Sequence, residues 1–169
     1  MPNLRQACKS DLPKLKVMYD DINKNLKEKD ACIYWSEFYP FPTFEQDIKQ
    51  GNLFVFVEDD NIISAFSLAE KASGEECFEW KSPLQASYLS KFAVDVKYSR
   101  KGFGLQALKF AEQIARKRKS KFLRLMVVDV NTPAIELYKR FGFSKVLGVY
   151  NENIYEDIFI SELGFEKEI

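Results

Sequence analysis

The sequence predicts an α/β fold of the α+β type, with a mixed central sheet of about six to seven strands flanked by about four helices. One observation is a strand, an amphipathic helix and a second strand in succession between residues 86 and 128, the pattern of a parallel β-α-β crossover. The other is a hairpin-like strand pair on each side of this unit, since hairpins make antiparallel pairs. The 169 residues, 46% of them apolar, suit one hydrophobic core, so we expect a single domain over residues 1–169.

The N-terminal segment predicts a short strand followed by a helix. Residues 4–7 alternate in hydrophobicity, and residues 10–13 supply an N-cap candidate and an early proline. The apolar face of the helix consists of Leu15, Met18, Tyr19 and Ile22. The charged residues 23–30 are either the solvated last turn of this helix or a mobile loop.

An aromatic segment with two prolines occupies residues 33–42 and can neither continue a helix nor form a central strand. It is either core packing beneath a loop or part of a ligand-binding wall. Residues 43–46 have the spacing of a capping box for a short helix that Gly51 ends. Residues 53–57 and 62–68, joined by a polar turn, predict a β-hairpin.

The C-terminal half alternates predicted strands and helices. Residues 72–83 show no clear period and predict a loop. Thr132 and Pro133 open the last helix, as N-cap and first helical residue, and Gly142 ends it. The strands are predicted over residues 86–96, 122–128, 143–150 and 154–160. The apolar face of the intervening helix consists of Leu105, Leu108, Ala111, Ile114 and Ala115.

Composition excludes several classes of function. The chain has no histidine, which rules out a Ser-His-Asp triad, an HExxH zinc helix and a histidine-ligated haem. Its 25 basic and 25 acidic residues give a net charge of zero, so no long-range field attracts nucleic acid or acidic membranes. We expect neither as a partner.

The cysteines and the N-terminus indicate a cytoplasmic protein without a metal. Cys8, Cys32 and Cys77 are odd in number and far apart, which fits neither a disulfide framework nor a CxxC metal site and suits a reducing compartment. The first residues lack the apolar region of a signal peptide, and no apolar run reaches the ~18 residues of a membrane span.

A glycine-containing loop leads from the strand at residues 86–96 into the following helix. Gly102 and Gly104 can adopt positive φ and let the backbone approach a ligand closely, while the free N–H groups of the helix N-terminus favour an anion. Arg100 and Lys101 add positive charge. The loop therefore predicts a phosphate or pyrophosphate site.

The loop is also compatible with two other interpretations. It satisfies a loose dinucleotide-binding fingerprint, but a polar bridge of about five residues separates the strand from the first glycine. The candidate acidic residue Asp129 comes late, with too little chain after it for a second half-sheet. The loop could also be only a tight strand-to-helix turn. No GxxxxGK[ST] motif is present, which excludes a P-loop.

A second motif follows the strand at residues 122–128, and with it the chain resembles the GCN5-related N-acetyltransferase (GNAT) superfamily. Residues 99–104 resemble that family's pyrophosphate loop, [QR]-x-x-G-x-[GA]. Ser99 stands where the family usually has glutamine or arginine, which weakens a side-chain contact that Arg100 could replace. The family's N-x-x-A-x-x-L-Y-x-x-x-G-F helix is matched at Asn131, Ala134, Leu137, Tyr138, Gly142 and Phe143.

The resemblance implies acetyl-CoA as acyl donor and assigns roles to residues. The pantetheine arm would pair with the backbone of Phe92, Ala93 and Val94. Asn131 would reach the cofactor, and Tyr138 would donate a proton to the departing thiolate, as a phenol with an ordinary pKa of ~10 can. The pyrophosphate would lie against Ser99, Arg100, Lys101, Gly102, Phe103 and Gly104.

The acceptor implied by the resemblance is a primary amine on a small molecule or peptide, acetylated by direct transfer in a ternary complex. The general base is left unassigned, because Met126 stands where some family members have a glutamate. The carboxylates near the expected acceptor cleft are Glu70, Glu79, Asp95 and Asp129. The alternative function is a non-catalytic acyl-CoA-binding module. Family members often dimerise through their last strands, so the resemblance also allows for a homodimer.

Overall fold

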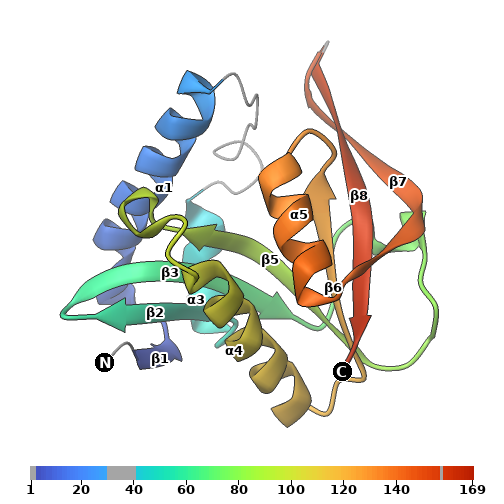
Figure 1. Cartoon of the computed structure of the whole chain (residues 1–169), viewed down its shortest axis with the longest axis horizontal. Coiled ribbons are helices and arrows are strands. Elements are labelled where there is room, and N and C mark those ends of the chain that lie inside the picture. The colour runs from blue at the N-terminus through green and yellow to red at the C-terminus, as the bar shows by residue number, and fades with distance from the viewer. Residues whose placement is uncertain (1–2, 30–40, 157) are drawn as a thin grey trace.

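The computed structural model describes residues 3–29, 41–156 and 158–169, and its centre is one mixed sheet (Figure 1). In these residues the sheet has eight strands in the order β1-β2-β3-β5-β6-β8-β7-β4. The strands are β1 (Asn3–Gln6), β2 (Leu53–Glu58), β3 (Asn61–Ala69), β4 (Phe78–Glu79), β5 (Ala86–Val94), β6 (Phe122–Val128), β7 (Ser144–Tyr155) and β8 (Ile158–Glu168). The helices are α1 (Leu12–Glu28), α3 (Pro42–Lys49), α4 (Phe103–Lys117) and α5 (Thr132–Phe141), with 3-10 turns η1 (Lys9–Asp11), η2 (Glu75–Cys77) and η3 (Val96–Tyr98).

The predicted fold class is confirmed. β5 and β6 pair in parallel and are joined by α4, while every other strand pair is antiparallel. The β2–β3 hairpin turns at Asp59 and Asp60, both with positive φ, as expected for a tight two-residue turn. Of the described helices, none is long and apolar enough to cross a membrane.

The core consists of a layer on each face of the sheet. On one face α4 and α5 pack against β3, β5 and β6, with Leu108 and Leu125 at the centre. On the other, α1 and α3 pack against β2 and β3 through Leu15 and Phe44. Figure 1 shows α4 and α5 in front of the sheet and α3 behind it. The gap between β5 and β6 therefore has α4 and α5 on one of its faces.

The strand count is higher than predicted because residues 78 and 79, predicted as loop, form the short strand β4 against Leu147 and Gly148 of β7. The strand predicted over residues 154–160 is wrong, since β7 ends at Tyr155 and β8 runs from Ile158 to Glu168. β7 reaches Tyr155 because it continues through the polar residues 151–153 that separate the two predicted strands. Asn151, for example, pairs with Ser161, whose hydroxyl donates to the Asn151 side chain at 2.7 Å.

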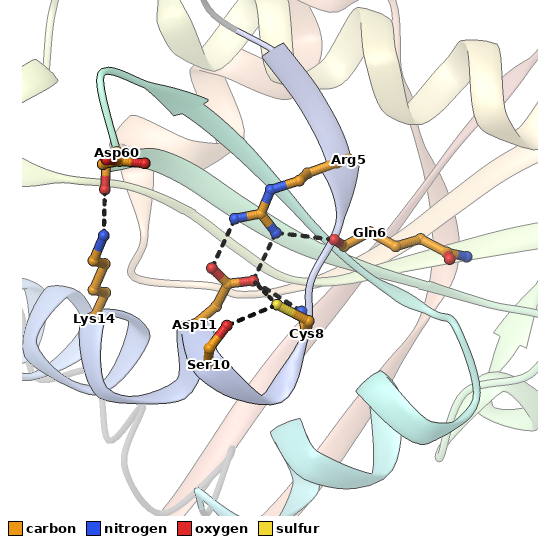
Figure 2. A network of polar contacts seen from close by, with 7 residues as sticks. All are labelled: Arg5, Gln6, Cys8, Ser10, Asp11, Lys14 and Asp60. Atoms are coloured by element: carbon orange, nitrogen blue, oxygen red, sulfur yellow. Dashed lines mark hydrogen bonds and ion pairs between the residues drawn. The ribbon is translucent and has the colours of Figure 1, made fainter.

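Helix α1 is fixed to the sheet by the polar network drawn in Figure 2. The Arg5 guanidinium on β1 binds both carboxylate oxygens of Asp11, at 2.7 and 2.8 Å, and the Cys8 amide donates to the same carboxylate at 2.8 Å. The Arg5 hydrogen bond is the largest cause that lowers the pKa of Asp11 to about 2. Lys14 donates to the Asp60 carbonyl at 2.6 Å and so ties α1 to the β2–β3 turn.

The helix boundaries settle one point that the sequence left open and show that one prediction is wrong. Helix α1 runs to Glu28, so residues 23–28 are its last turns. Helix α3 begins at Pro42, which puts Thr43 inside the first turn instead of at the predicted N-cap. Most of the aromatic segment at residues 33–42 lies outside the described residues.

Candidate active site

The parallel strands β5 and β6 separate halfway along their length. They are paired only from Ala86 and Phe122 to Leu89 and Leu125. Beyond this point β5 stays paired with β3, and β6 stays paired with β8 as far as Val128. The facing edges of the two strands then have no partner strand, which leaves backbone donors and acceptors available to a ligand.

A β-bulge in β5 accompanies this separation. Lys91, with φ of 52°, lies where Lys91 and Phe92 together oppose Phe66 of β3. Its carbonyl accepts a hydrogen bond from the Tyr19 hydroxyl of α1, and its ammonium group lies 2.5 Å from the carboxylate of Asp47 on α3. These contacts hold the bulge, and with it the divergent half of β5, against the helices.

A narrow cavity of about 30 Å³ lies between the separated strands. Three predicted site residues, Phe92, Asn131 and Tyr138, border it together. Ala93 has its side chain in the core beside α1, so only its backbone is available there. Lys91, Met126 and Glu162 also line the cavity. The structure therefore brings the strand and helix parts of the predicted site together.

Tyr138 reaches this cavity from α5 and is 6% exposed. Its ring makes edge contacts with Phe92 and Phe143, at centroid distances of 6.0 and 5.8 Å. In the described part of the chain no group hydrogen-bonds its hydroxyl, and burial raises the pKa of that hydroxyl above its usual range. The phenol is therefore neutral, and its ring is oriented by core packing.

Asn131 caps the N-terminus of α5, a role that the sequence predicts for Thr132. Its side-chain oxygen accepts from the Ala134 amide at 3.3 Å, so Asn131 is the N-cap of α5. The predicted cap, Thr132, is instead the first helical residue. Asn131 also borders the cavity, so the start of α5 is fixed at the edge of the separated strands.

The predicted phosphate loop has the geometry of an anion site. Arg100 and Gly102 have φ of 60° and 84°, and a side chain built at Gly102 would meet nothing within 4 Å. Helix α4 starts directly afterwards without a side-chain cap or an acidic residue in its first turn. Its first amides are thus free to bind an anion. A pyrophosphate bound at this loop stays a prediction.

Two residues of this loop have local partners. The Ser99 hydroxyl donates to the Val96 carbonyl at 2.8 Å, so it stabilises the turn at η3. A side chain at Gly104 would come within 3.1 Å of Leu137, so this glycine lets α4 and α5 approach closely. A role for either residue in ligand binding stays a prediction.

Glu162 is the residue that sequence reasoning missed. It lies on β8 opposite Val128 of β6, lines the cavity and is 7% exposed. Within the residues that the structure describes, no hydrogen bond or ion pair reaches its carboxylate, and burial, with a smaller effect of Glu152, raises its pKa to about 7. The predicted end of the last strand at residue 160 excluded it, and only the β6–β8 register reveals it.

The four carboxylates considered from the sequence do not border the cavity. Glu70, Glu79 and Asp129 are exposed, and Asp95 accepts a hydrogen bond from the Lys97 amide at 2.8 Å. Across the described ranges, no three Cys, Asp or Glu side chains are grouped so that they could hold a metal ion.

Several solved structures have this fold. An acetyltransferase of the GNAT family from Listeria monocytogenes is 21% identical, with a TM-score of 0.75 over 99% of this chain and 95% of the other. The ribosomal-protein-S18-alanine N-acetyltransferase of Escherichia coli is 19% identical, with a TM-score of 0.70 over 100% and 94%. The protein yncA of Salmonella typhimurium, solved with its cofactor acetyl-CoA, is 15% identical, with a TM-score of 0.68 over 99% and 94%.

Sequence comparison assigns the family. No curated protein matches the chain. The model of the acetyltransferase (GNAT) family matches residues 17–143, a range that includes the phosphate loop, both separated strands and Tyr138. The chain therefore belongs to the GNAT acetyltransferase family.

Proposed function

We propose that this protein is an acetyl-CoA-dependent N-acetyltransferase that transfers the acetyl group directly to a primary amine in a ternary complex. The observation that carries the proposal is the cavity between β5 and β6, where Phe92, Asn131 and Tyr138 meet. Acetyl-CoA would supply the acetyl group as a thioester. Its use is general in the family.

The binding residues follow from that geometry. The unpaired edge of β5 at Phe92 to Val94 would hydrogen-bond an extended pantetheine arm as a neighbouring strand does. The free amides at Gly102 to Gly104, with the cations of Arg100 and Lys101, would hold the pyrophosphate. Binding by backbone amides also explains why serine is acceptable at position 99.

Tyr138 is the proposed proton donor to the thiolate that leaves. Tyr138 borders the cavity, within the described residues no group hydrogen-bonds its hydroxyl, and Phe92 and Phe143 hold its ring. Because burial raises its pKa, the phenol carries its proton at neutral pH, which is the form that an acid needs.

Acetyl transfer by wild type and Tyr138→Phe tests the proposal. Thiol release from acetyl-CoA is followed with a polyamine, free lysine and a peptide with an N-terminal alanine. The last is included because one similar structure is an alanine N-acetyltransferase. We expect kcat of Tyr138→Phe to fall about 10²- to 10⁴-fold, the usual range for losing an acid catalyst.

Tyr88→Phe is the matched control, since it removes a buried phenol hydroxyl from the paired half of β5. It should keep its kcat. A wild-type kcat in Tyr138→Phe would refute the donor role. CoA binding by wild type without transfer to any amine would instead favour the non-catalytic acyl-CoA-binding module.

The acceptor, compartment and oligomeric state complete the proposed function. The acceptor is a small-molecule or peptide amine, the compartment is the cytoplasm, and residues 1–169 act as one domain. The free thiols of Cys8 and Cys77 support a reducing compartment. A homodimer is also proposed, to be tested by light scattering.

A further inference from the structure

Glu162 is a buried carboxylate that the fold leaves without compensation. Its side chain is 7% exposed, and in the described part of the chain no cation or hydrogen-bond donor contacts it. The other deeply buried glutamate, Glu166, binds Arg124 at 3.2 Å and accepts from the Lys81 amide at 2.8 Å. An unpaired buried charge destabilises a protein, so such groups are concentrated at functional sites.

The register puts Glu162 and Tyr138 on opposite faces of the sheet. On β6, Leu125 and Val127 pack in the layer formed by α4 and α5, so their neighbour Val128 faces the other way. Glu162 is the cross-strand partner of Val128 and shares its face. Tyr138 comes from α5 on the opposite face. Two proton-carrying groups thus reach one cavity from its two sides.

The other titratable groups around Glu162 include a second carboxylate, and among the described residues no nearby group neutralises its negative charge. Tyr150 is its cross-strand partner on β7, and Glu152 lies two residues further on the same face. Burial raises the pKa of Tyr150, and Glu152 and Glu162 raise it further. Lys91 is the cation that lines the cavity, and its ammonium group binds Asp47. A protonated amine entering this cavity would supply the missing positive charge.

On the basis of the proposed function, we propose that the acceptor enters as a protonated primary amine and that Glu162 accepts a proton from its ammonium group. The carboxylate takes one proton from R–NH₃⁺. The freed nitrogen lone pair forms the C–N bond to the acetyl carbon as the C–S bond breaks. The sulfur takes the proton of Tyr138, and the second proton lost from nitrogen converts the resulting phenolate back to the phenol. One proton then leaves Glu162 for solvent.

The acidity of Glu162 suits this role. Burial raises its pKa to about 7, where a group is both substantially ionised at neutral pH and basic enough to take a proton. Glu152 adds to the shift through its like charge.

The test compares wild type with Glu162→Gln and Glu152→Gln over pH 5.5 to 10, using the amine that wild type acetylates. For wild type, kcat/KM should rise with an apparent pKa near 7. Glu162→Gln should lose this step and about 10²- to 10⁴-fold of its activity at pH 7. The loss of activity in Glu162→Gln should become smaller above about pH 9, because more of the amine is then already unprotonated. Glu152→Gln should move the step to lower pH, since a like charge has been removed.

Glu168→Gln is the matched control, because Glu168 is exposed on the same strand and face but outside the cavity. It should keep the wild-type profile. An unchanged kcat/KM in Glu162→Gln at pH 7, or an unchanged step near pH 7, overturns the role of Glu162 and leaves the proposed function standing. Failure of wild type to acetylate any amine overturns the proposed function, and this role with it.

Discussion

Replacing Glu162 with glutamine should stabilise the protein at neutral and higher pH. Folding raises the pKa of this carboxyl from 4.5 to about 7, so the folded state disfavours its ionised form. At about 1.4 kcal/mol per pKa unit, the ionised group destabilises the wild-type fold by about 3 kcal/mol at pH 8. This destabilisation begins near the unfolded pKa, grows as pH rises, and levels off above the folded pKa. At pH 5 it is less than about 1 kcal/mol.

Urea unfolding at pH 5 and pH 8 measures this difference. Glutamine has nearly the same shape and does not ionise, so the free energy of unfolding of Glu162→Gln should exceed that of wild type by about 2 kcal/mol more at pH 8 than at pH 5. Comparing two pH values cancels any constant effect of the new amide. Glu168→Gln should follow wild type at both. A gain that does not depend on pH would refute the reasoning.

Three further predictions concern other parts of the molecule. Asp11→Asn should lower the free energy of unfolding by about 1–2 kcal/mol at pH 7. Because Arg5 holds the pKa of Asp11 near 2, this loss should disappear as pH falls from about 4 toward 2. A loss of stability that persists at pH 2 in an acid titration would contradict this. Gly102→Glu should weaken CoA binding, measured by calorimetry, far more than Gly102→Lys. Both variants carry the strain of a side chain at positive φ, but only glutamate adds a negative charge beside the anion. Equal losses of CoA affinity in the two variants would argue against an anion site. Glu166→Gln should cost about 3–5 kcal/mol in urea unfolding by leaving Arg124 buried and unpaired, and a cost under about 1 kcal/mol would exclude that ion pair as a stabilising contact.

Local chemistry made much of the fold predictable. The apolar periodicity of α4, the proline at the start of α1 and the positive-φ turn at residues 59 and 60 are each decided by neighbouring residues in the chain. The phosphate loop is of the same kind, because Gly102 and the helix that follows it are contiguous. Short-range patterns therefore located most elements and one half of the candidate site.

Long-range pairing could not be read in the same way. Strand β4 exists only because Phe78 reaches Gly148, about seventy residues later, and two residues carry no period of their own. Glu162 is one charged residue in a strand whose register against β6 decides whether it faces solvent or the cavity. The N-cap of α5 shows a smaller limit, since both Asn131 and Thr132 are good caps and only the backbone geometry selects the first.

The separation of β5 from β6 also changes where the sheet has unpaired strand edges. A sheet normally has unpaired strand edges only at its two margins, where a second chain can add to it. Here two further edges begin after Leu89 and Leu125 in the middle of the sheet, with α4 and α5 packed on one face. A narrow, extended molecule that entered between them would meet aligned donors and acceptors, as a neighbouring strand does. The sheet thus offers strand-like binding in its interior, separately from its two margins.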